Sequence, residues 1–451
     1  MEVTLMDMLE ARERRAYRQQ ALLEEFGSTL ICFTMNIAGP EKDSPLIQRG
    51  FLLGQQLLEG QLQSAGLAIR HRELLQANTG WEGMYVLSAP PLQIKALTAE
   101  IEDATPAGRL YDMDVLCPDG RKVDRQELGL PGRQCLICGG SAKACARSRS
   151  HTVPQLQEQT RQILTQALAE QDSRHIARLA CQALLYEAAT TPKPGLVDRA
   201  NSGSHRDMDI FSFQASAAAL WPYFARCAQI GIETAAQSPE ATFDALRLPG
   251  RLAEAQMRQA TGGVNTHKGA IFSLGIACAA LGRLPVAQWN SPERILEECA
   301  AMTRGLVARD YAGLTEETAQ TTGQKLYLRH GITGVRGQAE AGFPVVLKYG
   351  LPKLEQGLAL GKSMDLSGCA ALLAMLAHTA DTNLIHRGSY ALQAEISAQL
   401  ETMLEKNPFP DEATLRELDL QFTEKNLSPG GTADLLALVY LLHFIKEEAH
   451  V

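Results

Sequence analysis

The stretch Thr29-Leu-Ile-Cys-Phe-Thr-Met35 gives the clearest indication of how the first part of the chain folds. It is short, apolar and rich in β-branched and aromatic residues, which is typical of a buried strand. A helix is expected to begin at Pro45 and to run toward Leu62, because Ser44 can cap its amino end and proline fits the first helical position. Downstream we expect strands over 84–87 and 109–116 and a helix over 91–103. This alternation of strands and helices predicts an α/β or α+β layer.

Beyond about residue 155 the apolar residues follow helical spacing instead. The clearest example is the set Ile176, Leu179, Ala180, Ala183, Leu184 and Ala188. Similar helices are expected over 211–230, 268–281, 294–307, 365–380, 389–404 and 432–445. Since no convincing strand is found here, the second half is predicted to be all-α, with its site in loops and helix starts. The polar stretch 155–173 is expected to be the boundary between the halves and to be a helix itself.

Length and composition exclude several classes of protein. The 451 residues exceed the usual size of one hydrophobic core, so two domains are expected. A net charge of −8 argues against a general nucleic-acid binder, which is usually basic. The first 26 residues predict a charged helix without a signal-peptide core, and no apolar run is long enough to span a bilayer. Ten cysteines, most of them single in helix-like runs, favour a reducing compartment. We therefore expect a cytoplasmic protein that contacts neither membranes nor nucleic acid.

A pair of acids marks the first half, in Arg109-Leu-Tyr-Asp-Met-Asp-Val115. On a strand, Asp112 and Asp114 would share one face about 6–7 Å apart. Two carboxylates so placed favour a cation between them, and Mg²⁺ held by carboxylates and substrate phosphates is common in phosphoryl and nucleotidyl transfer. The alternative is a strand edge with two solvated acids, which is the more frequent explanation for such a pair.

A second cluster contains Cys135-Leu-Ile-Cys138, then Cys145 and His151. The first two cysteines have the spacing of a zinc knuckle, and the later cysteine and histidine would complete four ligands. The later spacing matches no common zinc finger, so we expect no obligatory structural zinc here. The interleaved cations could equally meet a phosphate-bearing substrate; they are Arg133, Lys143, Arg147 and Arg149.

Three glycine-rich loops mark the second half: Thr191-Pro-Lys-Pro-Gly-Leu-Val-Asp198, Thr261-Gly-Gly-Val-Asn-Thr-His-Lys-Gly269 and Leu427-Ser-Pro-Gly-Gly-Thr-Ala-Asp434. Each combines flexible backbone with charged or polar residues. Such segments form poor cores but suit a site where backbone N–H groups and cations meet a polyphosphate. A single loop of this kind often only makes a turn, whereas three in one region favour a ligand site.

These loops also carry a resemblance to a known family. Thr191–Asp198, Thr261–Gly269, Gly334–Gly342 and Ser428–Asp434 resemble the triphosphoribosyl-dephospho-CoA synthase family over roughly residues 175–446. The synthase family usually has an acid in its Arg-Gly-x-Ala element, where this chain has Gln338, with Glu340 just beyond. That departure argues against a catalytic role for the element.

The first half resembles apo-citrate lyase phosphoribosyl-dephospho-CoA transferase. The likeness rests on the sequence 108–115, on Arg133-x-Cys-x-x-Cys138 and on the Cys-Ala-Arg-Ser-Arg-Ser-His that ends at His151. The two resemblances together imply a fused, bifunctional enzyme. Residues 1–172 would form an α+β, nucleotidyltransferase-like domain, and residues 173–451 an all-α synthase domain.

The resemblance implies two successive reactions. The synthase half would join ATP to 3′-dephospho-CoA and release adenine. The transferase half would attach the product to a serine of the citrate lyase acyl carrier protein, the γ subunit, and release pyrophosphate. The alternatives are the matching pathway of malonate decarboxylase, from which the cysteine pattern of the first half differs, and a non-enzymatic zinc-bearing adaptor.

The resemblance also suggests residue roles. Asp198 or Asp207 would be the base of the first reaction, with His205 or His267 near adenine or phosphate. Lys193, Lys268 and Arg336 would hold the triphosphate, with Mg²⁺. The candidate substrate-binding residues are Lys193, Gly262, Gly263, Asn265, Thr266, Lys268, Arg336, Arg387, Ser428, Gly430 and Gly431. Asp112 and Asp114 would hold the metal of the second reaction.

Overall fold

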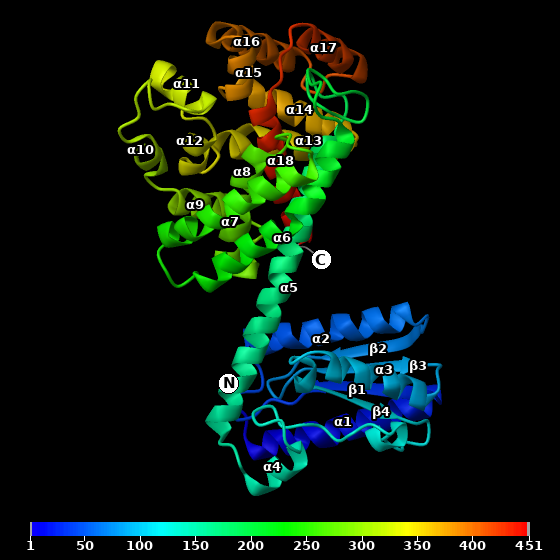
Figure 1. Cartoon of the computed structure of the whole chain (residues 1–451). Helices are drawn as coiled ribbons and strands as arrows, with labels where there is room; N and C mark the ends of the chain where they lie inside the picture. Colours follow the sequence, from blue (N-terminus) through cyan, green and yellow to red (C-terminus); the bar gives the residue numbers. More distant parts are fainter. Residues whose placement is uncertain (1, 449–451) are drawn as a thin grey trace. The chain divides into compact units, whose positions relative to one another are not determined.

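The computed structural model describes residues 2–448, and the chain divides into two compact units, residues 1–170 and 171–451 (Figure 1). The first unit contains one four-stranded antiparallel sheet with the strand order β2-β3-β1-β4. The strands are β1 Thr29–Met35, β2 Ile69–Leu75, β3 Glu82–Leu87 and β4 Tyr111–Leu116. The register of β4 against β1 places Asp112 opposite Thr34 and Asp114 opposite Cys32.

Helices cover both faces of this sheet. The principal helices are α1 Leu5–Phe26, α2 Pro45–Ser64 and α3 Pro91–Ala104. As predicted, Ser44 caps α2, its hydroxyl accepting the N–H of Ile47. On one face, buried residues of α2 and α3 pack against Phe33 and Tyr111; on the other, Leu22 of α1 packs against Leu30. The α+β prediction for the first half is confirmed.

A long loop follows β4 in the first unit. It contains the short 3₁₀ helix η2 Arg125–Leu128 and the helix α4 Ala142–Ser148, and another 3₁₀ turn, η1 Gly108–Leu110, precedes β4. The helix α5 Val153–Ala189 then continues for 37 residues. Leu164 is fully buried in the first unit and Ile176 belongs to the core of the second. The prediction that 155–173 is helical is therefore correct.

The second unit is built from helices, and its residues up to 448 include no strand. Its longer helices are α6 Ile210–Glu233, α7 Pro239–Ala260, α8 Lys268–Arg283, α9 Pro292–Met302, α14 Met364–Ala377, α16 Tyr390–Lys406, α17 Glu412–Glu424 and α18 Gly430–Glu448. Shorter pieces are η3 Val286–Gln288, α10 Leu306–Tyr311, α11 Thr322–His330, α12 Gly334–Glu340, the π turn η4 Val346–Gly350, α13 Leu351–Ala359 and α15 Thr382–Arg387. The all-α prediction is confirmed.

The core of the second unit surrounds α18, in which every residue from Leu435 to Ile445 is buried. One predicted helix proved wrong, because the span 294–307 is broken. The helix α9 ends at Met302 and α10 begins at Leu306, and between them Gly305 adopts a left-handed backbone with φ of 70° that interrupts the helix. None of the described helices combines the length and apolar character that a membrane span requires.

Candidate active sites

The acid pair of the first unit lies on β4, where buried and half-buried residues alternate. Tyr111, Met113 and Val115 point into the core, so Asp112 and Asp114 share the opposite face. Their side chains are 46% and 29% exposed. The strand therefore presents two accessible carboxylates side by side, as its alternation requires.

The charges around this pair offset its repulsion only in part. The Nζ of Lys122 lies 2.5 Å from Asp114 Oδ1, whereas the nearest cation to Asp112 Oδ1 is Arg133 Nη2 at 3.7 Å. Burial, and then the negative charge of Asp114, raise the pKa of Asp112 above its usual value. Two carboxylates in this state are a donor set that suits Mg²⁺.

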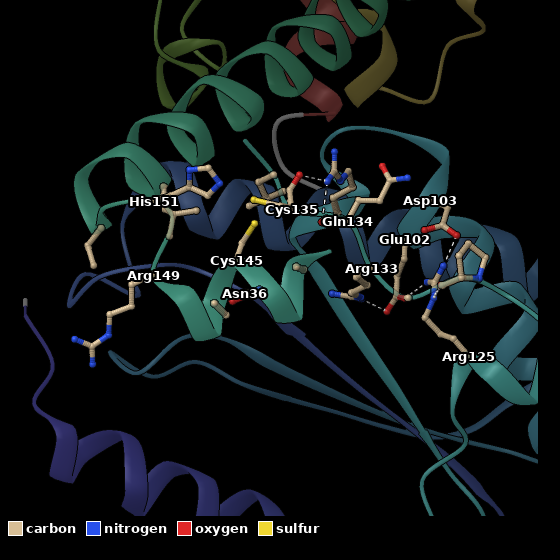
Figure 2. A pocket seen from close by; sticks show the side chains of 18 of the residues that line it. Asn36, Glu102, Asp103, Arg125, Arg133, Gln134, Cys135, Cys145, Arg149 and His151 are labelled. Carbon is tan, nitrogen blue, oxygen red and sulfur yellow. Dashed lines mark hydrogen bonds and ion pairs between the residues drawn. The ribbon is translucent and has the colours of Figure 1, made fainter. Parts of the chain in front are cut away.

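The first unit also contains a cavity of about 1000 Å³ (Figure 2). Four arginines line it, Arg109, Arg125, Arg133 and Arg149. Buried Glu102 holds two of them, with 2.9 Å from its Oε2 to Arg125 Nη1 and 2.5 Å from its Oε1 to Arg133 Nη2. Asp112 does not line the cavity, but Arg133 contacts both. The arrangement places a cationic pocket next to the carboxylates, as a polyphosphate substrate would require.

Arg15 of α1 was not among the predicted site residues. Its Nη2 donates to Glu82 Oε1 at 2.8 Å, while its Nε is buried without a hydrogen-bond partner among the described residues. Burial works to lower the pKa of Arg15, but the bond to Glu82 and the charges around it, including Asp112, raise it overall. Sequence gave no signal for this residue, because Arg15 stands in a run of charges on a helix that is mostly exposed.

In the second unit, Lys193 forms a buried ion pair. Its Nζ lies 2.5 Å from Glu187 Oε1 and also donates to the Glu187 carbonyl at 2.6 Å. Burial raises the pKa of Glu187, and the nearby charge of Lys193 opposes that rise. The other two cations predicted to hold triphosphate are also paired: Lys268 Nζ lies 3.1 Å from Glu254, and Arg336 Nε lies 2.8 Å from Asp310.

The two predicted base candidates have different surroundings. The Asp198 carboxylate is buried and accepts three backbone N–H groups, from Lys193 at 2.9 Å, Ala200 at 2.7 Å and Asn201 at 3.0 Å. These bonds hold the turn together. Asp207, by contrast, is 66% exposed, and its Oδ1 lies 4.0 Å from His205 Nδ1.

His205 joins three segments that are distant in sequence. Its Nε2 lies 2.9 Å from Ser428 Oγ and its Nδ1 lies 3.3 Å from Arg387 Nη2. Arg387 also donates to the carbonyl of Ser204 at 2.9 Å. Burial, and then the charge of Arg387, lower the pKa of His205, which favours the neutral ring. The structure thus brings together three of the predicted residues.

His267 has one nitrogen without a partner. Its Nδ1 lies 2.7 Å from Ser216 Oγ, while Nε2 is buried and finds no hydrogen-bond partner in residues 2–448. Burial, and then the charge of Lys193, lower the pKa of His267 to about 3. A buried, neutral ring with one open nitrogen is costly unless a ligand completes it. The neighbouring Thr266 hydroxyl is likewise buried and unpartnered.

Asp434 belongs to the same part of the fold, although it was not in the predicted set. Its carboxylate packs so tightly on Gly269, near the start of α8, that a Cβ there would collide with it. Burial, then the charges of Glu187 and Asp381, raise its pKa well above the usual value. The loops 261–269 and 427–434 therefore meet. The sequence placed Asp434 at the end of a glycine-rich loop but could not show this contact.

The remaining predicted residues lie around these contacts. Gly262 and Gly263 are exposed with φ of 67° and 98°, and Asn265 is exposed beside them. Gly430 and Gly431 begin α18, close to Asn383 and Asp381 respectively. Asp381 itself is structural, since its carboxylate accepts N–H groups of α15 and of Thr432.

The comparisons with known proteins agree with this two-part organisation. Residues 173–450 match the family described as ATP:dephospho-CoA triphosphoribosyl transferase, and residues 3–167 match the apo-citrate lyase phosphoribosyl-dephospho-CoA transferase family. The chain belongs to both families. We call residues 171–451 the synthase unit and residues 1–170 the transferase unit.

Two full-length relatives have the same fusion. "Protein CitXG" of Haemophilus influenzae is 35% identical over 457 residues, covering 98% of this chain and 96% of that protein. "Protein CitXG" of Leuconostoc mesenteroides subsp. cremoris is 32% identical over 457 residues, covering 98% and 97%. The chain is a bifunctional transferase of the citrate lyase prosthetic-group pathway, with ATP and dephospho-CoA as substrates of the synthase unit. The resemblance drawn from sequence is confirmed, and a non-enzymatic adaptor is excluded.

In the synthase unit, Gln338 stands where the family usually has an acid, and the structure shows what the nearby acid does. Glu340, the acid just beyond it, accepts the N–H of Gly305 at 3.0 Å and that of Val307 at 2.8 Å. These bonds satisfy the free amides at the start of α10. The acid of this element therefore serves as a helix cap.

We expect Asp198→Asn and Asp207→Asn to behave differently. The Asp198→Asn change turns one carboxylate oxygen into an NH₂ group, so at least the Lys193 amide or the Ala200 and Asn201 amides lose their acceptor. Each unsatisfied group costs about 1–3 kcal/mol, so the melting temperature should fall. The Asp207→Asn change should leave the melting temperature unchanged and lower adenine release by about 10²–10⁴-fold, if Asp207 is the base. Differential scanning fluorimetry and an adenine assay on both variants measure this. Normal adenine release by the Asp207 variant would move the base elsewhere, with Asp434 as the next candidate.

Proposed function

We propose that each unit holds one complete active site, with residues 1–172 as the transferase domain and 173–451 as the synthase domain. The observation that carries this proposal is that each candidate residue finds its partners within its own unit. Asp112 neighbours Arg133, and His205 contacts Arg387 and Ser428. The synthase reaction then runs to completion without groups from the transferase unit.

In the synthase unit, the proposed reaction is a single inverting displacement at C1 of the ATP ribose. The ribose of ATP is β-linked, whereas the product of the family is α-linked, which one inversion explains. The 2′-hydroxyl of dephospho-CoA forms the new bond as adenine leaves, and Asp207 takes the hydroxyl proton. The open Nε2 of His267 hydrogen-bonds to the adenine or to a phosphate oxygen.

The triphosphate would lie where helix starts and cations gather. The starts of α8 and α18 offer free N–H groups and the positive ends of two helix dipoles. Lys193, Lys268 and Arg336 supply charge, the last two by exchanging a half-buried carboxylate partner for phosphate. Gly262, Gly263 and Gly430 allow the backbone to approach the phosphates.

In the transferase unit, we propose a nucleotidyltransferase-type reaction. The serine hydroxyl of the acyl carrier protein attacks the phosphorus next to the ribose, and pyrophosphate leaves with the electrons of the broken P–O bond. Asp112 and Asp114 would hold Mg²⁺, which when bound offsets the phosphate charge. Arg133 and Arg109 orient the phosphates from the cavity wall. The match to an apo-citrate lyase family favours this carrier over that of malonate decarboxylase.

The test is whether the activities separate. A fragment of residues 171–451, or 174–451, given ATP, Mg²⁺ and dephospho-CoA should release adenine at close to the full-length rate, measured by mass spectrometry. Only the full chain should then add the prosthetic group to apo acyl carrier protein, seen as a mass increase. A folded fragment that releases no adenine, while the full chain does, would mean that the two units build one site.

A further inference from the structure

The four potential metal ligands of the transferase unit converge in space. One ligand atom each from Cys135, Cys138, Cys145 and His151 lies within 4.8 Å of all the others, and 3.5 Å separates the sulfurs of Cys138 and Cys145. Figure 2 shows Cys135, Cys145 and His151 facing one another at the cavity wall. Tetrahedral zinc with Zn–S bonds of about 2.3 Å places its sulfurs about 3.8 Å apart. The cluster therefore has the dimensions of a zinc site.

The local backbone holds the three cysteines in position. A tight turn pairs Gln134 with Ser141, and the N–H of Cys135 donates to the Gly140 carbonyl at 2.6 Å. The turn thus places two sulfurs on one side. The helix α4 supplies Cys145 from a second element.

His151 returns to the cluster through a distorted backbone. The C-cap residue of α4, Arg149, adopts a left-handed conformation with φ of 50°, which is uncommon for a side chain of this size. The chain then turns so that the His151 ring reaches the three sulfurs. Its Nε2 is buried and has no hydrogen-bond partner among residues 2–448. A ligand at this nitrogen would remove the cost of leaving it unpaired.

The lack of buried residues in this segment is independent support for a metal site, because the segment has almost no hydrophobic core. Between residues 124 and 152 the single buried residue is Cys135. Ordering a backbone costs about 1–2 kcal/mol per residue, which such a segment cannot recover from apolar contacts. Structural zinc contributes about 10–16 kcal/mol in small metal-binding domains. A bound metal supplies the stabilising free energy that a hydrophobic core would otherwise give this segment.

We propose that Cys135, Cys138, Cys145 and His151 bind a structural Zn²⁺ ion. The proposal replaces the expectation that the chain has no obligatory structural zinc. That expectation rested on the later ligand spacing, which matches no common zinc finger. Three thiolates and one imidazole form a closed four-ligand set, so the ion positions the chain and takes no part in the reaction. It fixes the cavity wall, since Arg109 donates to the carbonyls of Gln134 at 2.8 Å and Cys135 at 2.5 Å.

Metal analysis of the full-length chain tests the proposal. Protein produced with zinc in the medium and desalted under reducing conditions should contain one zinc per chain by inductively coupled plasma mass spectrometry. Cys138→Ser and Cys145→Ser should each lose most of it, whereas Cys181→Ser, which removes a cysteine of the synthase unit, should keep it. Cobalt in place of zinc should give the thiolate charge-transfer and tetrahedral absorption bands.

A second measurement keeps the proposal open to refutation if the variants fold poorly. Modifying the thiols of the wild-type chain should release zinc in step with loss of three thiols, while adenine release by the synthase unit continues. Zinc well below one per chain, with no cobalt spectrum after reconstitution, would overturn the proposal. So would a chain lighter by two hydrogens whose Cys138 and Cys145 form a disulfide. Neither result depends on the proposed catalytic roles.

Discussion

Replacing Asp112 and Asp114 together with asparagine is expected to reduce transfer to the acyl carrier protein by at least about 10³-fold, while adenine release continues at the wild-type rate. The physical reason is charge: the substitution keeps the size of each side chain but removes two negative charges that would bind Mg²⁺. A metal ion typically stabilises a phosphate transition state by several kcal/mol, and each 1.4 kcal/mol is about tenfold in rate. The triphosphoribosyl intermediate should accumulate, which mass spectrometry would detect.

The stability of the Asp112→Asn variant separates a catalytic from a structural role. The pKa of Asp112 is raised in the folded chain, so folding favours the protonated carboxyl. The stability that this group contributes is present below its unfolded pKa and is lost as the pH rises through the folded value. At neutral pH the ionised carboxylate therefore opposes folding, and asparagine relieves that effect. Thermal unfolding at pH 7 should occur at the same temperature as in the wild type or higher.

The matched control is Asp119→Asn, which changes an exposed acid in the turn just after β4. Among residues 2–448 its carboxylate accepts only the N–H of Arg121, at 3.0 Å, so transfer should be unaffected. Full transfer activity in the Asp112→Asn, Asp114→Asn double variant would reduce the pair to a solvated strand edge. Loss of adenine release in the same variant would contradict the separation of the two sites.

The fold was predictable where local signals were strong. The strand Thr29–Met35 has the predicted bounds, and the capping serine of α2 was predicted from two residues, because both signals are local. The strand β2 was missed, since Ile69–Leu75 carries charged side chains and leaves its residues half-buried or exposed. It joins the sheet through backbone hydrogen bonds to β3, which hydrophobic periodicity does not reveal.

The site residues were predictable only where the two-residue period of a strand or closeness in the sequence places them together. The alternation of β4 correctly gave Asp112 and Asp114 one face. Sequence could not separate Asp198 from Asp207, because the difference lies in which backbone amides reach each carboxylate. Nor could it find the contact of Asp434 with Gly269, which lies on another helix. Contacts between segments that are distant in the sequence decide such roles, and these contacts cannot be predicted from a single sequence.

A large effect in the synthase unit is also expected from His267, because its open nitrogen lies in a buried site. His267→Asn keeps a polar group near the position of Nδ1, so the contact with Ser216 can survive, but nothing replaces Nε2. His267→Gln extends an amide toward the position of Nε2 and gives up the contact with Ser216. If Nε2 contacts adenine or phosphate in the transition state, the asparagine variant should lose about 10²–10³-fold in adenine release. The glutamine variant should retain more.

The pH profile of adenine release supports this assignment independently of the variants. The pKa of His267 is lowered to about 3, so the folded chain favours the neutral ring. Its contribution to stability is present above the unfolded pKa of about 6.5 and is lost as the pH falls toward 3. The rate should therefore show no inflection from this ring between pH 6 and 8, since a neutral imidazole accepts or donates a hydrogen bond without changing charge. Transfer of preformed intermediate to the carrier protein should be unchanged in both variants. Equal loss of adenine release in the two, together with a lower melting temperature, would make His267 a packing residue bonded to Ser216, and another group would then have to contact the adenine or the phosphate.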